Sequence, residues 1–69
     1  MIVVRLGEMM KRRGVRSQAE LARLTGLSAN SISSIAHGRG RLESIGRICA
    51  ALDCQPGDLL EYVPENPSL

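Results

Sequence analysis

The chain has 69 residues, 43% of them hydrophobic and 23% charged, which is typical of one globular domain and argues against a disordered chain. With one tyrosine and no Phe or Trp, the core must be built from aliphatic side chains. No apolar run approaches the roughly 18 residues that span a bilayer, and the first residues lack the layout of a signal peptide. We therefore expect a cytoplasmic protein with no membrane contact.

Charge is distributed unevenly along the chain. All nine basic residues precede Asp53 together with only three acidic residues, which gives this part a net charge of +6. From Asp53 onward there are four acidic residues and no basic one, a net charge of −4. The split fits a surface that faces a polyanion and a C-terminal end with another role, although charge that serves only solubility fits equally well.

The N-terminal part predicts an extended segment and then a helix. Residues 2–4 are β-branched and favour extended backbone. From about Arg5 the spacing becomes helical until Gly14, with Leu6, Met9, Met10 and Arg13 recurring every three to four residues.

A second helix is predicted from a capping box. The Ser17 hydroxyl is placed to accept the amide of Glu20, while the Glu20 side chain reaches back to the amide of residue 17. This helix should end near Thr25 and Gly26 and carry Leu21, Ala22 and Leu24.

A third helix is predicted between a cap at Ser28 and a stop at Gly38, with Ile32, Ile35 and Ala36 inside. Its connection to the second helix has the composition of a tight turn. Ala22 is small where the two axes approach, Gly26 permits a positive φ, and Leu27 fills the turn from the core side.

The C-terminal half predicts two more helices. A short, flexible basic loop spans Gly38 to Arg41, and the helix that begins near Leu42 carries one apolar face formed by Leu42, Ile45, Ile48, Cys49 and Leu52. Pro56 suits the first turn of a short fifth helix that runs through Leu60. Residues 60–63 can be extended, and 64–69 read as a flexible tail.

These segments resemble the phage-repressor and Cro-type helix-turn-helix domains, the XRE family. The resemblance covers roughly residues 5–61 and depends on runs such as Ser17 to Ala22, Gly26 to Ser28, Ile32 to Ile35, and Leu52 to Leu60. It implies an all-α, five-helix repressor-like DNA-binding domain over residues 1–63. It also implies that the extended N- and C-terminal segments pair as a small antiparallel sheet.

The resemblance implies a sequence-specific regulator of transcription, most simply a repressor, that binds double-stranded DNA through its third helix in the major groove. The residues that would face base edges are Ser28, Ala29, Asn30, Ser33 and Ser34. Those that would contact phosphates are Gln18, Arg16, Arg23, His37, Arg39 and Arg41. The chain departs from the family pattern in a shorter loop after Gly38 and in Ala36 and His37 ahead of that glycine.

Several of these residues have a simpler alternative role. Ser28 serves as a helix cap whether or not it touches a base, and His37 fits a C-terminal cap. Serines are poor choices for the stability of an exposed helix, which favours base reading at positions 33 and 34. Whether residues 11–13 are a DNA-facing patch or a solvated face stays open.

No catalytic, metal or cofactor site is expected. A single histidine offers no nucleophile–base pair with an orienting acid, and Cys49, Cys54 and His37 are too few for a zinc site. The two cysteines are expected to act as small buried hydrophobic residues. We expect neither an enzyme nor a small-molecule ligand.

One short reading helix contacts few bases, so a homodimer on a two-fold symmetric operator is expected. The predicted dimer interface consists of Ile2, Val4, Leu59, Leu60, Tyr62 and Val63. The alternative function is that of a DNA-binding antitoxin or a component that works with a protein partner. RNA binding is a weaker alternative because the chain has only one aromatic residue.

Overall fold

The computed structural model describes residues 1–65, and residues 66–69 of the predicted tail lie outside the described part. Its helices are α1 (Leu6–Arg12), α2 (Gln18–Thr25), α3 (Ala29–Ala36), α4 (Leu42–Leu52) and α5 (Pro56–Leu59). Two strands, β1 (Ile2–Val4) and β2 (Leu60–Tyr62), flank them in the sequence. The predicted all-α, five-helix architecture is confirmed.

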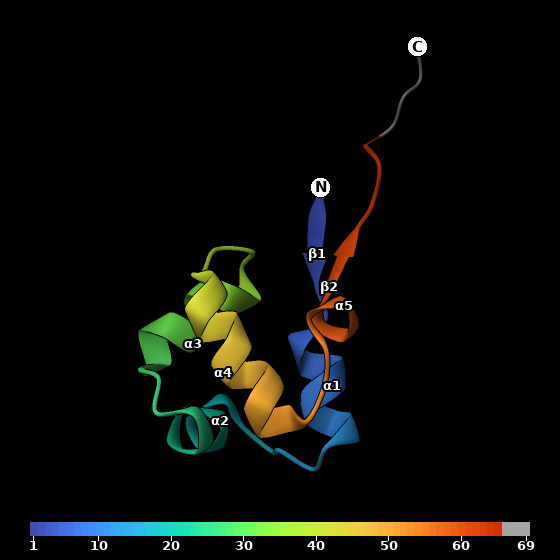
Figure 1. Ribbon diagram of the computed structural model, residues 1–69. Coiled ribbons are helices and arrows are strands. Elements are labelled where there is room, and N and C mark those ends of the chain that lie inside the picture. The colour runs from blue at the N-terminus through green and yellow to red at the C-terminus, as the bar shows by residue number, and fades with distance from the viewer. Residues whose placement is uncertain (66–69) are drawn as a thin grey trace.

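The two strands pair with each other, as expected. They are antiparallel, with Ile2 opposite Tyr62, Val3 opposite Glu61 and Val4 opposite Leu60. The pairing continues toward the helices through the Arg5 amide, which donates to the Leu59 carbonyl at 2.6 Å. Figure 1 shows the ribbon standing on α1 and α5, on the other side of α4 from α2 and α3.

An ion pair reinforces the base of this ribbon. Arg5 donates to the carboxylate of Glu61 through Nε, at 2.6 Å, and through Nη2. This hydrogen bond and the negative charge of Glu61 raise the pKa of Arg5 above its usual value. The pair is solvent-exposed, so it contributes to register more than to stability.

The core is aliphatic, as the composition requires. Its buried members come from every helix: Leu6, Met9, Met10, Val15, Leu21, Ile32, Ile35, Ile48, Leu52 and Leu59. α2 packs against both α3 and α4, so three helices close over Leu21, Ile32 and Ile48, none of which is exposed to solvent.

Two leucines expected on inward faces lie outside the core. Leu24 is 56% exposed and Leu42 is 85% exposed. Leu42 is the first residue of α4 and precedes the turns that pack on the core, while α2 turns Leu21 and not Leu24 toward its neighbours. The spacing of apolar residues predicted the helices correctly. How many of those residues are buried depends on which neighbouring elements cover the helix.

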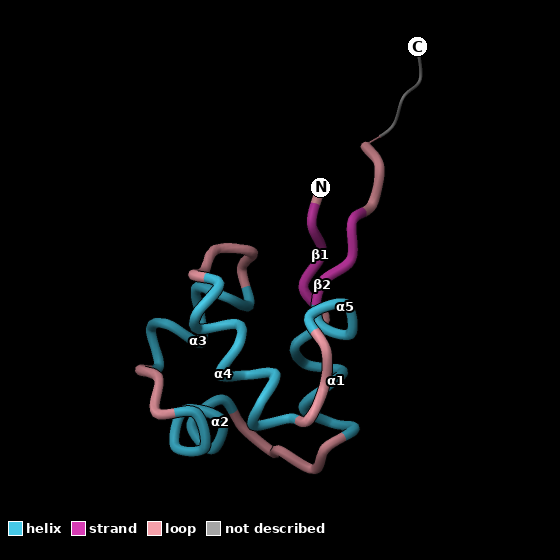
Figure 2. Tube along the Cα trace, in the orientation of Figure 1, coloured by secondary structure: helices cyan, strands magenta, loops and turns pink. Residues whose placement is uncertain are grey.

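The first residues of the loop after α3 are hydrogen-bonded to the end of that helix. The Arg39 amide donates to the Ser34 carbonyl at 2.8 Å and the Gly38 amide to the Ile35 carbonyl at 3.0 Å. Gly38 has φ +83°, which suits the left-handed end of a helix. Figure 2 shows this loop as an arch on the same end of the molecule as the strands.

Gly40, in that loop, is packed closely against Ile35. A Cβ atom added at Gly40 would lie 2.6 Å from Cγ1 of Ile35, whereas a Cβ added at Gly46 in α4 would meet nothing within 4 Å. We therefore predict that Gly40→Ala lowers the free energy of unfolding by about 1–3 kcal/mol because the buried Ile35 must move.

The matched variant Gly46→Ala should raise the free energy of unfolding by about 0.5–1 kcal/mol, since it adds helix propensity without a clash. Urea unfolding followed by circular dichroism measures both variants. Equal effects of the two substitutions would show that the loop does not rest on Ile35.

Candidate nucleic-acid interface

The helix-turn-helix is built from two capped helices joined by a left-handed turn. Ser17 accepts the Glu20 amide at 3.1 Å, as predicted. The Glu20 carboxylate, however, accepts the amide of Arg16 at 2.8 Å, one residue before the expected position. This bond ties the chain entering α2 to its first turn, so the N-terminal end of α2 is fixed in place.

Gly26 makes the turn between α2 and α3. Its φ is +75° and its amide donates to the Ala22 carbonyl at 2.8 Å. Thr25 completes the turn, because its hydroxyl donates to the Leu21 carbonyl at 2.8 Å and accepts the Leu27 amide at 3.2 Å. These three hydrogen bonds hold the turn between α2 and α3.

α3 begins at Ser28, which accepts the Ser31 amide at 3.1 Å. Ile32 and Ile35 turn inward and are buried. The predicted base-reading residues lie on the rest of the helix surface: Ser28, Ala29, Asn30 and Ser34 are exposed and Ser33 is half-buried. The outer face of α3 is therefore short, polar and uncharged.

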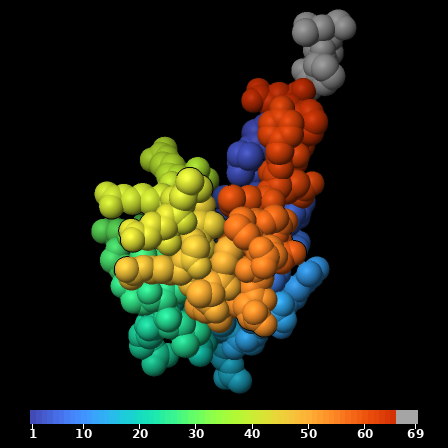
Figure 3. All heavy atoms as spheres, viewed as in Figure 1, coloured from blue at the N-terminus to red at the C-terminus, as the bar shows by residue number. Residues whose placement is uncertain are grey.

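An open hollow lies between α3 and the beginning of α4. It has a volume of about 640 Å³ and is lined by Leu27, Asn30, Ser31, Ser34, Ile35, Arg39, Gly40, Arg41, Glu43, Ser44 and Arg47. Of the predicted contact residues it brings together Asn30, Ser34, Arg39 and Arg41. The segment that leads from α3 into α4 protrudes at the upper left of Figure 3, coloured yellow-green to yellow.

The remaining predicted contacts lie outside this hollow. Gln18 is the first residue of α2 and is exposed, as are Arg16 and Arg23. His37 ends α3, and its Nδ1 lies 2.8 Å from the Ser33 carbonyl. That contact fits the capping role considered for His37 and orients its ring along α3.

Arg47 was missed by the sequence analysis. It lies on α4, yet a Cβ built at Gly26 would be 3.6 Å from its Nη1, so the guanidinium reaches back over the α2–α3 turn. The available signal was the position of Arg47 one turn after Glu43 on the polar side of α4. Sequence alone does not show that this side of α4 faces α3.

The basic side chains of the hollow have no acidic partner in the part of the chain that the structure describes. The ion pairs found over residues 1–65 involve only Arg5 and the Met1 amino group. Arg39, Arg41 and Arg47 form no ion pair within these residues and outnumber Glu43, the one acidic residue that lines the hollow, so its lining carries a net positive charge beside a polar helix face. Such a surface suits a polyanion that offers negative charges to the arginines and polar groups to the face of α3.

No cluster of three or more His, Cys, Asp or Glu residues that could hold a metal is present over residues 1–65. None of the helices described is long and apolar enough to cross a membrane.

Comparison with known proteins agrees with this geometry. Residues 5–65 match the family model of the Cro/C1-type HTH DNA-binding domain. The chain is also 36% identical over 64 residues to the uncharacterized HTH-type transcriptional regulator YozG of Bacillus subtilis (strain 168). That alignment covers 88% of this chain and 75% of the relative.

The helix-capping residue and the proposed base-reading residue of α3 can be distinguished by how their substitution changes the free energy of unfolding. Ser28→Ala removes the cap and should lower the free energy of unfolding by about 1 kcal/mol. Asn30→Ala removes an exposed side chain and should leave it within about 0.5 kcal/mol of wild type or slightly higher. Urea unfolding of both variants measures the difference, and an equal loss for Asn30→Ala would make Asn30 a structural residue.

Proposed function

Because the chain belongs to the Cro/C1-type helix-turn-helix DNA-binding family, we propose that it represses transcription by placing α3 in the major groove of a double-stranded operator. The observation that carries the proposal is the polar outer face of α3 beside three arginines that form no ion pair with the described residues and outnumber Glu43 in the lining of the hollow. Residues 1–63 would act as one DNA-binding domain in the cytoplasm.

Phosphate contacts would position the domain on the duplex. Arg39 is held by its backbone bond to Ser34, and Arg41 immediately precedes α4. Arg47 would add a third positive charge on the opposite wall of the hollow. Gln18 would bind a phosphate at the N-terminus of α2, where the helix dipole favours an anion.

Base contacts would then supply specificity. Asn30 is exposed in the first turn of α3, and its amide matches the N6 and N7 edge of adenine. Ala29 offers a methyl group for thymine, and the short serines leave room for water-mediated contacts. The proposed reader therefore depends on one direct contact together with DNA shape.

We predict that selection from random duplex DNA recovers a two-fold symmetric site for wild type. In the site selected by Asn30→Ala, one position in each half-site should be relaxed, with a cost of about 1–3 kcal/mol for the correct base. Because Asn30→Ala is expected to fold normally, a relaxed position in the selected site would reflect the loss of a base contact and not a loss of folding. Salt-sensitive binding with no enriched sequence would contradict the proposal and favour a protein partner, as in an antitoxin.

Dimer formation would use the apolar face of the β ribbon. Ile2 and Tyr62 are directly opposite in the pairing and are 52% and 66% exposed, while Val4 and Leu60 on the same face are half-buried. A two-stranded ribbon is marginal alone and gains from a partner. Leu59, expected in this interface, is 1% exposed because it packs in the core of its own chain, so it cannot contact a second copy.

A small apolar groove adjoins this face of the ribbon. It has a volume of about 110 Å³, and its walls come from the ribbon, from the loop after α3 and from Ile45 on α4. A second copy docked there would lie next to the proposed DNA-contacting loop. The two α3 helices would then be related by a two-fold axis, as a symmetric operator requires. Val63, whose amide donates to the Met1 carbonyl at 2.8 Å, would extend the same ribbon.

We expect wild type to sediment as a dimer at micromolar concentration and Tyr62→Glu as a monomer, because a charge would be buried in the interface. Leu24→Glu is the matched control, since Leu24, at 56%, is nearly as exposed as Tyr62, at 66%, but lies on α2. A monomeric wild type, or dissociation caused equally by both variants, would contradict this interface.

A further inference from the structure

Two cysteines lie together where α4 ends. Cys49 is in the last turns of α4, and Cys54 follows the helix by two residues. Both are free, both are half-buried, and both pack against the core. They lie at the end of α4 remote from the hollow, so the proposed DNA interface uses neither thiol.

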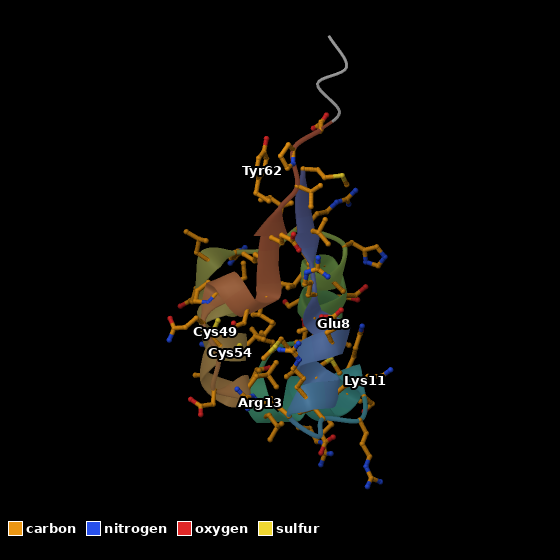
Figure 4. All side chains as sticks on the ribbon, turned by 90° about the vertical axis from the view of Figure 1, so that its right-hand side faces the viewer. Glu8, Lys11, Arg13, Cys49, Cys54 and Tyr62 are labelled. Carbon is orange, nitrogen blue, oxygen red and sulfur yellow. The ribbon has the colours of Figure 1, made fainter. Side chains whose placement is uncertain are left out.

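The backbone brings these two residues together. Asp53 adopts a left-handed conformation with φ +51°, and its amide donates to the Cys49 carbonyl. The Cys54 amide donates to the same carbonyl at 3.0 Å. In this kind of helix end, the residue after the left-handed position packs its side chain on the residue five positions earlier. Here both members of that contact are cysteines, and Figure 4 shows them side by side.

The electrostatics agree with a close contact between the thiols. Burial, and next the neighbouring Cys49 thiol, raise the pKa of the Cys54 thiol above its usual value, while Arg13 opposes the shift. The pair is thus a partly accessible dithiol rather than two separate core residues.

The surrounding bonds hold this helix end in place. Arg13 of the α1 cap donates from Nη2 to the Asp53 carbonyl at 3.1 Å. On the other side, the Gln55 amide donates to the Asp58 carboxylate at 2.9 Å. Hydrogen bonds from the end of α1 and to α5 therefore hold residues 53–55 in place. The Cys54 amide nitrogen lies 3.0 Å from the Cys49 carbonyl oxygen, so the two residues are neighbours across this helix end. A disulfide requires such proximity, because it joins residues whose Cα atoms are about 4.4–6.8 Å apart.

From this geometry we propose that Cys49 and Cys54 form a reversible intrachain disulfide site, oxidised by a low-molecular-weight disulfide. The thiolate of one cysteine attacks the small disulfide, forms a mixed disulfide and releases one small thiolate. The second cysteine, as thiolate, attacks the protein sulfur of the mixed disulfide and releases the second small thiolate. Two protein thiols are oxidised and one small disulfide is reduced to two thiols.

Oxidation would fasten the junction between α4 and α5. This junction leads into Leu59 and β2, so the cross-link would stabilise the base of the ribbon and not the reading helix. The proposal is independent of the DNA-binding function. We expect oxidised protein to melt at a higher temperature and to keep its affinity for DNA within about twofold, because the phosphate-facing loop is at the other end of α4.

The test is equilibration of the full chain with mixtures of oxidised and reduced glutathione, in buffer and in urea, followed by thiol blocking and mass spectrometry. Folded wild type should lose two hydrogens per chain without gaining glutathione. The effective concentration of one thiol toward the other should be at least about tenfold higher in the folded than in the unfolded chain. Cys49→Ser and Cys54→Ser should each form only the mixed disulfide.

Three results would overturn the proposal. They are an effective concentration in folded wild type no higher than in urea, disulfide-linked pairs of chains, and persistent mixed disulfides like those of the serine variants. The comparison of folded with unfolded wild type needs no substitution, so it remains valid even if a serine variant fails to fold.

Discussion

The left-handed turn at Gly26 is the constraint on which the rest of the structure depends. It lets α3 turn Ile32 and Ile35 under α2 while the remainder of α3 faces outward. Without a Cβ at this position, the turn adopts φ +75° at no steric cost. The guanidinium of Arg47 fills the space above it, so the same turn links the packing of the core to the charge of the hollow.

The arginine-lined hollow and the apolar face of the ribbon lie next to each other, because Arg39 and Gly40 line both the hollow and the small groove beside the ribbon. The loop after α3 and the beginning of α4 carry arginines without acidic partners, whereas the C-terminal elements carry acidic residues and the apolar face of the ribbon. In the proposed complex the first group faces phosphates and the second faces another copy.

Local signals in the sequence were sufficient for the elements. The caps at Ser17 and Ser28, the stops at Gly26 and Gly38, and Pro56 in the first turn of α5 are where they were predicted. Each depends on backbone hydrogen bonds or φ preferences within a few residues. Such interactions are determined by neighbouring residues in the sequence and need no tertiary contact.

Features that depend on distant neighbours were not predicted correctly. Leu24 and Leu42 follow the helical period, but no other element covers them. Leu59 was assigned to the dimer interface, although it is buried in the core of its own chain. Arg47 was missed because its importance comes from α4 crossing beside the α2–α3 turn. The contact between Cys49 and Cys54 was likewise not visible from spacing alone, since it requires the left-handed conformation at Asp53.

We propose that the outer face of α3 and the adjoining arginine-lined hollow bind duplex DNA. The most direct measurement is an NMR titration of isotopically labelled protein with a short mixed-sequence duplex at low salt. We expect the amide shift changes to concentrate in the first turn of α2, in α3 and in residues 38–41. Changes confined to α1, α5 and β2, or no changes at all, would contradict it.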